Sequence, residues 1–596
     1  MPQETLALIK GGSFLTDELS AEDIFTPEDF TEEHRMIAAT AEQFVENEVV
    51  PRIEEMEAKK VGINEALLRQ AGEIGLLGAS IPEAYGGEGL DQVSSTILAE
   101  KSGRYGSFAT TFGAHTGIGT LPIVYFGTEQ QKAKYLPKLA TAEWIAAYAL
   151  TEAESGSDAL NAKTKAVLSP DGRHYVLNGT KMFITNAGFA QVFITFAKVD
   201  GEKFTGLIVE RGFSGVTVGP EEHKMGIRGS STCTLILENA LVPVENVLGE
   251  IGSGHKIAFS ILNFGRFKLG ASVVAGIRYT TNEAIRYAKG REQFGKPIIE
   301  FGAIQHKLAE MAVRIFCAES MVYRTVGMID ASMRSIDKSG PNAASETLKA
   351  LEDYAVECSI IKVANSEILD FVVDEAVQIY GGYGYSQDYP VERAYRDARI
   401  NRIFEGTNEI NRLLITGQLL KKAMKGQLPL VSAAQKLLGE LLSFASVDDE
   451  DGRLLAAENR LVANAKKIFL LASGAAVQKY RDKIGDQQEV LCLLSDLVMG
   501  IYAMESVLLR VLKGIARDGA AQWQLQAKAA QIIIHGQLPE LDDKARQILS
   551  ATSEGDELRT HLAALRRFTK STPVNLIALR QEIARKLNEE TKYCLS

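Results

Sequence analysis

The stretch KAVLSPDGRHYVLNGTKMFITNAGFAQVFITFAKV, residues 165–199, decides the fold because it interrupts a chain that is otherwise helical in pattern. Its β-branched and aromatic residues recur with a period of two, which is typical of half-buried strands. Pro170-Asp171-Gly172 and Asn178-Gly179 are turn signals between these runs, and we expect a hairpin at each. Because alternation returns in TCTLILENALVPVENVLG, residues 232–249, the sequence predicts a small antiparallel β-domain over residues 146–252.

Helical periodicity lies on both sides of this region. PEDFTEEHRMIAATAEQFVENEVVPRIEEMEAK, residues 27–59, repeats apolar residues every three or four positions, with a capping region at Thr26–Thr31. We therefore expect an N-terminal helical domain over 27–145, a helical bundle domain over 253–425 and, after MKGQLPL, a helical extension over 430–596. The predicted fold class is mostly α with an inserted β-domain, and ligand sites are expected at the domain junctions.

Length and charge exclude several classes of protein. At 596 residues the chain is too long for a single core and should divide into roughly three or four domains. A formal charge of −11 without a large basic block argues against nucleic acid as the main partner. An acidic chain can still hold an anionic cofactor through a few local Lys and Arg side chains and helix N-termini.

Cysteine usage and apolar stretches bear on the compartment. The five cysteines are scattered, with no CxxC pair and no histidine at ligand spacing, which favours a reducing compartment and argues against disulfides or a zinc site. The N-terminal stretch lacks a basic region followed by an apolar run, so we expect no signal peptide and a cytoplasmic location. The apolar stretch VLCLLSDLVMGIYAMESVLLRVL, residues 490–512, is interrupted by Asp496 and Glu505, which predicts a buried bundle helix rather than a membrane span.

One glutamate has an unusual setting. In RIFEGTNEINR, residues 402–412, Glu405 follows the bulky pair Ile403-Phe404 and precedes Gly406. Burial beside apolar groups disfavours the ionised carboxylate, so the pKa of Glu405 should rise toward the range of a general base. The other interpretation is a helix N-terminus, with Gly406-Thr407-Asn408 as the capping run and Glu409 supporting it.

Three further segments have features suited to a cofactor. YALTEAESGSD, residues 148–158, offers hydroxyls and backbone amides that can surround a flavin edge or a phosphate, although many loops are rich in Ser and Gly for no chemical reason. KMFITNAG, residues 181–188, sets Phe183 and Thr185 on one face of a strand, where they suit a flat ring. Arg291, at a helix end, would meet either a pyrophosphate or solvent.

The four motifs YALTEAESGSD, KMFITNAG, YPVERAYRDAR and IFEGTNEINR, in this order, resemble the acyl-CoA dehydrogenase family over residues 27–425. The extra helical block, the LNFGR segment (262–266) and the overall length resemble its very-long-chain branch, including bacterial relatives. The resemblance implies an N-terminal helical domain, a middle antiparallel β-barrel and a C-terminal four-helix bundle, followed by an extra helical domain.

The activity implied by the resemblance is FAD-dependent α,β-dehydrogenation of long-chain fatty acyl-CoA to trans-2-enoyl-CoA, the first step of β-oxidation. Glu405 matches the base that removes the α-proton, while FAD takes the β-hydride. Some branches of the family place the base directly before the arginine of the GR pair. That position is Gly265 here, so the base is assigned to Glu405.

The resemblance also implies contacts with the cofactor and the substrate. The matching cofactor positions are Tyr148, Leu150, Thr151, Gly156, Ser157, Phe183, Ile184, Thr185, Arg291, Phe294, Gln378, Gly381, Gly382, Thr407 and Glu409. The matching substrate positions are Ser157, Asn263, Arg266, Phe404 and Gly406. Asn263 departs from the aspartate of shorter-chain members. Arg291 and Gln378 would reach the FAD of a neighbouring subunit, which implies a homodimer.

The expected partners are a long-chain acyl-CoA, electron-transfer flavoprotein as electron acceptor, and a second copy of the chain, with no metal. By similarity, the block 430–596 covers the surface through which shorter members pair dimers into tetramers, and peripheral membrane contact is an alternative role for it. The helix TTFGAHTGIGTLPI, residues 110–123, should border the acyl channel. Its small residues would admit a long tail or serve close helix packing; they are Gly113, Ala114, Gly117 and Gly119.

Three other functions fit parts of the sequence. An acyl-CoA oxidase would use the same base and flavin but pass electrons to oxygen. Loss of bound flavin on purification would favour an assembly or scaffold protein on this fold, against which Glu405 and the loop 148–158 argue. A purely structural helical protein would have no need for the polar loops of the β-domain.

Overall fold

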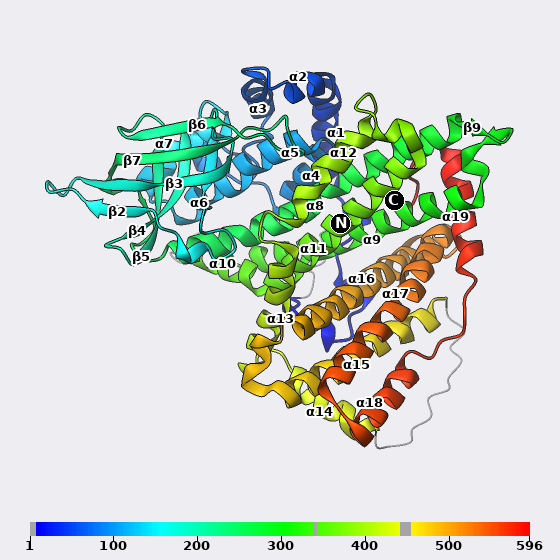
Figure 1. Ribbon diagram of the computed structural model, residues 1–596. Coiled ribbons are helices and arrows are strands. Elements are labelled where there is room, and N and C mark those ends of the chain that lie inside the picture. Colours follow the sequence, from blue (N-terminus) through cyan, green and yellow to red (C-terminus); the bar gives the residue numbers. More distant parts are fainter. Residues whose placement is uncertain (1–7, 338–342, 442–453) are drawn as a thin grey trace.

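The computed structural model describes residues 8–337, 343–441 and 454–596 (Figure 1). A β-sheet lies at one end, a bundle of long helices occupies the middle, and the C-terminal helices form a second group beside that bundle. The helices before the sheet are α1 (Glu32–Phe44), α2 (Ile53–Glu57), α3 (Ile63–Glu73), α4 (Gln92–Ser102), α5 (Gly106–Gly113), α6 (Leu121–Phe126) and α7 (Glu129–Ala140). The predicted fold class, mostly α with an inserted β-domain, is confirmed.

The first helix begins where the sequence predicts a cap. The Thr31 hydroxyl accepts a hydrogen bond from the His34 N–H at 3.1 Å, which satisfies an amide that has no partner within α1. Between α5 and α6, residues Ala114–Gly119 form a π-helical segment, so the helix predicted over 110–123 changes its pitch midway.

The β-domain is one eight-stranded sheet, paired in the order β6-β7-β3-β2-β4-β5-β8, with β1 beside β4. Its pairs are antiparallel except that β1 and β2 both run parallel to β4. The strands are β1 (Ala146–Ala149), β2 (Lys165–Leu168), β3 (His174–Thr185), β4 (Val192–Val199), β5 (Lys203–Glu210), β6 (Val216–Glu221), β7 (Thr232–Pro243) and β8 (Val247–Leu248).

Only one of the two predicted hairpins forms. The turn at Pro170-Asp171-Gly172 joins β2 to β3 as an antiparallel hairpin, as predicted. The hairpin predicted at Asn178-Gly179 is wrong, because β3 continues through these residues between β2 and β7 with a bulge in its register. A side chain at Gly179 would lie 2.3 Å from the Thr164 hydroxyl, so glycine serves close strand contact here.

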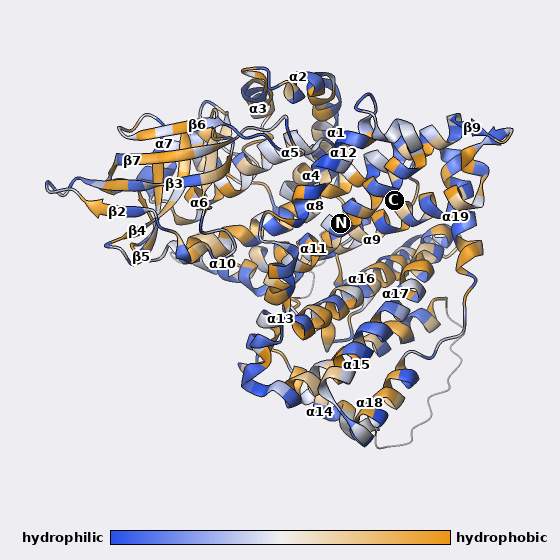
Figure 2. Cartoon of the chain, in the orientation of Figure 1, coloured by the Kyte–Doolittle hydropathy of each residue, from blue (hydrophilic) through white to orange (hydrophobic). Residues whose placement is uncertain are grey.

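The middle bundle consists of long helices around a buried core. α8 packs against α9 and α11, and α13 packs against α11. Hydrophobic residues alternate with hydrophilic ones along these helices (Figure 2), as expected where one face is buried and another meets solvent. The elements of this region are α8 (Gly254–Gly290), β9 (Glu292–Gln293), β10 (Lys296–Pro297), α9 (Gly302–Arg334), α10 (Ala343–Asp353), α11 (Ala355–Tyr380), α12 (Pro390–Ala398) and α13 (Asn408–Met424).

The C-terminal extension is helical, as predicted, and its longest helix packs against the bundle. α16 contacts both α9 and α13, and α19 contacts α9. The extension comprises α14 (Leu430–Leu441), α15 (Ala456–Tyr480), α16 (Gln488–Asp518), α17 (Gln524–Thr552), α18 (Gly555–Phe568) and α19 (Leu576–Glu590). Within the described ranges, two helices, α8 and α16, are long and apolar enough to cross a membrane, but most of each apolar window is buried inside the protein. For α16 this agrees with the predicted buried bundle helix.

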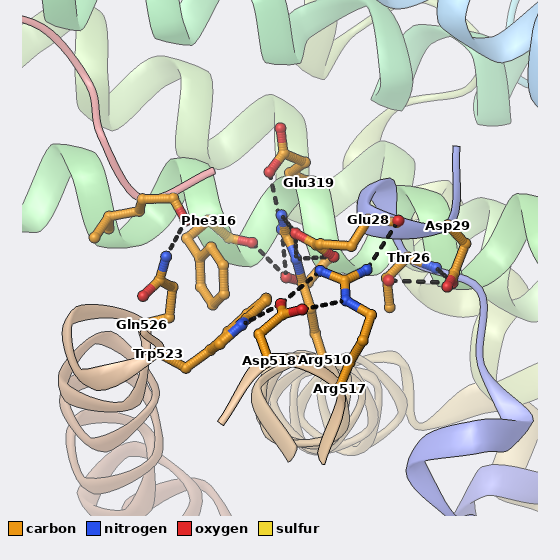
Figure 3. A network of polar contacts seen from close by, with 12 residues as sticks. Thr26, Glu28, Asp29, Phe316, Glu319, Arg510, Arg517, Asp518, Trp523 and Gln526 are labelled. Carbon is orange, nitrogen blue, oxygen red and sulfur yellow. Dashed lines mark hydrogen bonds and ion pairs between the residues drawn. The ribbon is translucent and has the colours of Figure 1, made fainter. Parts of the chain in front are cut away.

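A buried charge cluster joins α16 to the rest of the molecule (Figure 3). Arg510 of α16 donates to Glu28 at 2.6 Å and to Glu319 of α9 at 2.8 Å. Glu319 also accepts a hydrogen bond from Arg278 of α8, which donates to Glu100 of α4 at 3.1 Å. We call these five residues the Arg510 cluster.

The residues before α1 also pack against both helical groups. Phe14 and Leu15 are buried, and the Phe14 ring meets Tyr502 of α16 edge-on at 4.8 Å between centroids. The Gly12 N–H donates to Glu357 of α11 at 2.6 Å. This segment therefore bridges the bundle and the extension, a contact that the helical pattern of the sequence did not indicate.

Candidate active site

A cavity of about 210 Å³ lies between the N-terminal helices and the bundle. It is bordered by α4, α5, the π-helical segment and α8, and Thr185 and Glu405 both line it. One face of α8 follows the cavity, since its lining residues recur at intervals of three and four: Gly265, Lys268, Leu269, Ser272, Val273, Gly276, Tyr279 and Thr280. Gly265 and Thr280 are fifteen positions apart, which is about 22 Å along the axis at about 1.5 Å per helical residue.

The carboxyl group of Glu405 lies against the backbone of Gly265. A Cβ atom at position 265 would come within 2.3 Å of the Glu405 Oε2. Glycine at this position is therefore what leaves room for the carboxylate beside α8. Positions 265 and 405, the two places where members of the resembled family carry the base, are therefore in contact, and only position 405 carries an acid.

The backbone at Glu405 has an uncommon conformation. Its φ is 57°, in the left-handed region, and that of Gly406 is 81°. A non-glycine residue persists there only when its surroundings hold it, and such strain gathers at functional sites.

Three buried side chains hold this turn by its carbonyl groups. Arg266 Nε donates to the Glu405 oxygen at 3.3 Å, and Lys362 Nζ donates to the Gly406 oxygen at 2.6 Å. Asn411 Nδ2 donates to the Gly406 and Thr407 oxygens at 2.8 and 3.0 Å. The turn is thus fixed by its backbone, which leaves the carboxylate of Glu405 free to face the cavity.

The electrostatic setting suits a general base. Burial raises the pKa of Glu405 to about 7, although the positive charges of Arg266 and Lys362 counter part of the rise. Within the part of the chain that the structure describes, Oε2 has no hydrogen-bond partner. Burial in turn lowers the pKa of Lys362 to about 8. A carboxylate with a pKa near neutrality and one unsatisfied oxygen can take a proton from a bound molecule.

The capping interpretation of the same motif is confirmed as well. Thr407 is the N-cap of α13, and its hydroxyl accepts from the Ile410 N–H at 3.2 Å. Glu409 lies in the first turn of α13 and is exposed to solvent. A hydrogen bond from its own backbone N–H is the main cause that lowers the pKa of its carboxyl group. Glu405 and the helix start are therefore consecutive parts of one motif.

Several predicted cofactor residues come from β1, β3 and the loop that follows β1. Thr185 lines the cavity, and Phe183 holds a φ of 58° with 61% of its side chain exposed. Tyr148 and Leu150 are buried, and burial raises the pKa of Tyr148, with the Glu405 charge adding to the rise. The Ile184 side chain is packed into the core of the β-domain, so only its backbone is available to a ligand.

The loop after β1 is held by residues that the sequence analysis missed. Glu152, adjacent to Thr151, pairs with the fully buried Lys181 of β3 at 2.7 Å. The Glu152 carboxylate also accepts from the Thr164 N–H at 3.1 Å. Gly156 and Ser157 lie exposed beyond this anchor. A lysine inside the alternating pattern of a buried strand was the available signal.

Five other predicted cofactor residues lie far from Glu405 in the same chain. They lie in the last turn of α11 or just after the ends of α8 and α11, and all are exposed: Arg291, Phe294, Gln378, Gly381 and Gly382. Along the axis of α8, the distance from Gly265 to Gly290 is about 37 Å. Phe294 is 95% exposed, and the Arg291 guanidinium lies 5.6 Å from the Tyr383 ring centroid. A single chain therefore does not bring these residues to its own Glu405.

The predicted substrate residues divide into two groups. Phe404 lines the cavity beside Glu405. Asn263 and Arg266 are buried behind the Glu405 turn, where Arg266 Nη1 donates to Asn263 Oδ1 at 2.9 Å. Lys362 and Asn411, which hold the same turn, were not singled out from the sequence, although a lone lysine in the apolar run CSIIKVAN was a signal.

The small residues of the segment 110–123 do not all have the same role. Gly113, Ala114 and Gly117 line the cavity, and a side chain at either glycine would meet no other atom within 4 Å. The prediction that Gly119 widens the channel is wrong, because a Cβ atom at this position would lie 2.8 Å from the Ala146 Cβ. This glycine serves close packing against β1 rather than the width of the channel.

Comparison with known proteins covers most of the chain. Residues 31–143 match the model of the acyl-CoA dehydrogenase N-terminal domain, and residues 147–240 match that of the middle domain. Residues 252–420 and 464–567 match two models that are both described as acyl-CoA dehydrogenase, C-terminal domain.

Relatives and solved structures agree with these matches. The chain is 50% identical over 593 residues to a probable acyl-CoA dehydrogenase of Bacillus subtilis (strain 168), covering 100% of both. It is 38% identical to the human mitochondrial very long-chain specific acyl-CoA dehydrogenase, over 74% of this chain and 69% of that protein. A crystal structure of an acyl-CoA dehydrogenase from Bacillus anthracis complexed with FAD matches with a TM-score of 0.96 and 52% identity, covering 98% of this chain and 100% of that one.

Proposed function

The chain belongs to the acyl-CoA dehydrogenase family, and on this premise we propose that it oxidises long-chain acyl-CoA to trans-2-enoyl-CoA with FAD, using Glu405 as the base. The observation that carries the proposal is the carboxylate of Glu405, which borders the cavity with a raised pKa and an unpartnered oxygen. A thioester α-proton is weakly acidic, so its removal needs a base of this kind in a site that excludes water.

The β-domain residues on β1 and β3 fit a flavin. Phe183 combines a left-handed backbone with a largely exposed aromatic ring, which is costly unless another group covers the ring. The Tyr148 hydroxyl is buried without a hydrogen-bond partner among the described residues, so a polar ligand would satisfy it. We assign FAD to this place, with Tyr148, Leu150, Thr151, Phe183 and Thr185 around it. Bound FAD supplies the acceptor for the hydride that leaves the β-carbon.

The chain's own residues supply the remaining chemistry. Glu405 Oε2 accepts the α-proton, and Arg266 and Lys362 keep enough of the carboxylate ionised near neutral pH. The Glu405 N–H, which makes no hydrogen bond to another described residue, is assigned as a donor to the thioester oxygen. Phe404, beside the base, helps to exclude water.

The cavity supports a long acyl chain. An extended polypeptide advances about 3.3–3.6 Å over the three backbone bonds of each residue, which is about 1.2 Å per bond. An extended alkyl chain advances by a similar amount, so about 18 of its bonds would follow the α8 wall. Each buried methylene should add about 0.8 kcal/mol of binding until the cavity ends. Gly113, Ala114 and Gly117 place no bulk in this path.

We further propose a homodimer in which Arg291, Phe294, Gln378, Gly381 and Gly382 complete the FAD site of the partner subunit. Their exposure and their distance from Glu405 in one chain support this arrangement. Arg291→Ala should then lower FAD retention more than acyl-CoA affinity. Light scattering should show a dimer, and a monomer with full FAD occupancy would contradict the shared site. We propose electron-transfer flavoprotein as the electron acceptor.

The experiment that tests the function is anaerobic bleaching of the purified flavoprotein by a series of saturated acyl-CoA substrates. We expect kcat/KM to rise from C8 to at least C14, and Gly117→Leu and Ala114→Glu to shift the optimum to shorter chains. Gly417→Leu is the matched control, because Gly417 is also a helical glycine with open space around it but does not line the cavity. A wild-type optimum at C4 to C8 would contradict the length assignment. Protein purified without flavin would favour a scaffold, and rapid reoxidation by oxygen would favour an oxidase.

A further inference from the structure

The turn that carries Glu405 is the start of a continuous chain of polar contacts. Lys362, which holds the Gly406 oxygen, also donates to Asn408 Oδ1 at 2.7 Å. Asn408, the first residue of α13, donates from Nδ2 to Glu367 Oε1 at 3.0 Å. Lys362 and Glu367 are both on α11, so this helix holds both the Glu405 turn and the first residue of α13.

The same chain of contacts continues into the C-terminal extension. Arg412, one turn after Asn408 on α13, donates to both oxygens of Glu367 at 2.8 and 3.0 Å. Its Nε donates to Asp496 of α16 at 2.8 Å, and the Ser495 hydroxyl donates to the Arg412 backbone oxygen. One guanidinium therefore joins α11, α13 and α16 within a few residues of the base.

These contacts are strong by the ordinary standards of ion pairs. Arg412 binds Glu367 in a bidentate geometry and Asp496 through its remaining nitrogen, so each bond is charge-assisted. The side chains of Arg412 and Asp496 are only 17% and 22% exposed, which limits screening by water. The two carboxylates raise the pKa of Arg412 although burial alone would lower it.

α16 is a fixed point for this chain because it is anchored elsewhere as well. About four turns further along α16, Arg510 is held by Glu28 and Glu319 in the Arg510 cluster (Figure 3). Glu505, between the two sites, pairs with the buried Arg324 of α9 at 2.7 Å. Asp496 and Glu505, the two acids that interrupt the apolar run of this helix, therefore both bind arginines of the bundle.

We propose that Asp496 is a positioning residue for the catalytic base. By fixing Arg412, Asp496 holds the first turn of α13 and, through Asn408 and Lys362, the strained Glu405–Gly406 backbone. The inference rests on the proposed function of Glu405 and adds to it that the C-terminal extension supports the active site. A displacement of this turn by a fraction of an ångström would separate the carboxylate from the α-proton, to which rate is highly sensitive.

The test uses the full-length flavoprotein and compares Asp496→Ala with Arg580→Ala. Arg580 of α19 binds Glu310 of α9 at 2.5 Å, with side chains 17% and 12% exposed, so its loss breaks another extension–bundle ion pair of similar burial. Among the described residues, that pair is extended only by Arg314, and no hydrogen bond or ion pair leads from it to Glu405. We expect Asp496→Ala to slow flavin reduction at saturating acyl-CoA about tenfold, while half-saturation and FAD content stay within twofold of wild type. Arg580→Ala should change none of the three.

A second readout does not depend on activity. Hydrogen exchange of backbone amides over residues 405–416 should accelerate about tenfold in Asp496→Ala and stay unchanged in Arg580→Ala. Asp496→Asn, which keeps an acceptor oxygen for Arg412 Nε, should recover most of the wild-type behaviour in both readouts. If Asp496→Ala does not fold, Arg412→Lys replaces it with the same expectations, because lysine cannot bind both carboxylates in the same geometry.

The outcomes separate the inference from the proposed function. If wild-type protein is not bleached by any acyl-CoA, the proposed function fails, and hydrogen exchange still tests the link between Asp496 and the turn. Reduction within twofold of wild type in Asp496→Ala, or equal exchange in the two alanine variants, would overturn the positioning role.

Discussion

Two buried carboxylates of this protein, Glu405 and Glu100, have opposite electrostatic settings. Burial raises the pKa of Glu405 to about 7, and its Oε2 has no partner among the described residues. Burial would also raise the pKa of Glu100, but the Arg278 and Lys101 charges outweigh it and hold the pKa below its usual value. Glu100 accepts hydrogen bonds from Arg278 and Tyr323.

The difference lies in what holds each residue. The cations near Glu405 bind its turn by backbone oxygens, so they fix the position of the carboxylate without satisfying it. In the Arg510 cluster, arginines bind the carboxylate oxygens themselves, which turns the same buried charge into a link between helices. A buried acid is thus suited to accept a proton or to link helices according to whether its donors reach the backbone or the side chain.

The most severe way to test this comparison is to neutralise each acid in turn. We expect Glu405→Gln to retain FAD but to lower acyl-CoA-dependent flavin reduction by at least about a thousandfold, because the proton acceptor is lost. Glu100→Gln should reduce its flavin at close to the wild-type rate per folded molecule. Rapid-mixing absorbance measurements give both rates, and more than a few per cent of activity in Glu405→Gln would show that another group is the base.

The same two variants should change stability in opposite directions. Glu100→Gln leaves Arg278 partly uncompensated, and we expect a loss of about 3 kcal/mol in the free energy of unfolding. Glu405→Gln should instead stabilise the protein by up to about 3 kcal/mol above pH 7, since a pKa raised from 4.5 to about 7 disfavours the ionised acid in the folded state. This gain should shrink as pH falls through 7 and vanish below about 4.5. Denaturant titrations at pH 8 and pH 5 check both signs, and a shared sign would refute the contrast.

The sequence predicted one of these acids and not the other. Glu405 lies in a local motif, where a bulky pair, an acid, a glycine and a cap are contiguous. Glu100 binds residues 178 and 223 positions away, so its role depends on tertiary packing that no local pattern contains. The left-handed backbone of Glu405 and its tethers Lys362 and Asn411 were out of reach for the same reason.

The fold shows the same division between local and distant information. Periodicity located the inserted sheet, and the cap at Thr31 was predicted from neighbouring residues. The hairpin at Asn178-Gly179 was wrong because that dipeptide lies in a strand paired on both sides, which outweighs its turn preference. The bridging segment with Phe14 and Leu15 was missed because it is too short to show a period.

A smaller perturbation keeps the acid and moves it. In Gly265→Ala, the new methyl group would overlap the Glu405 Oε2, whose distance from an ideal Cβ is 2.3 Å, so the carboxylate must shift. We expect the rate of flavin reduction to fall about tenfold to a hundredfold. The free energy of unfolding should change little, because the contacts of Glu100 are untouched. Gly113→Ala is the matched control. Gly113 lines the same cavity, but a Cβ atom at this position would have no other atom within 4 Å. Equal rates in the two variants would show that the contact with Gly265 does not position the base.

The mildest test concerns the pH at which the unsatisfied acid becomes active. Only ionised Glu405 accepts a proton, so kcat/KM should fall about tenfold per unit as pH drops below the pKa near 7. The charged groups facing it are Arg266 from α8 and Lys362 from α11, and both favour ionisation. Lys362→Met should therefore move this acidic limb upward by about one pH unit. Lys268→Met is the control, because Lys268 lines the same cavity but does not contribute to the pKa shift of Glu405. If Lys362→Met leaves the limb in place, or Lys268→Met moves it equally, the pKa of Glu405 is not set by the cations that hold its turn.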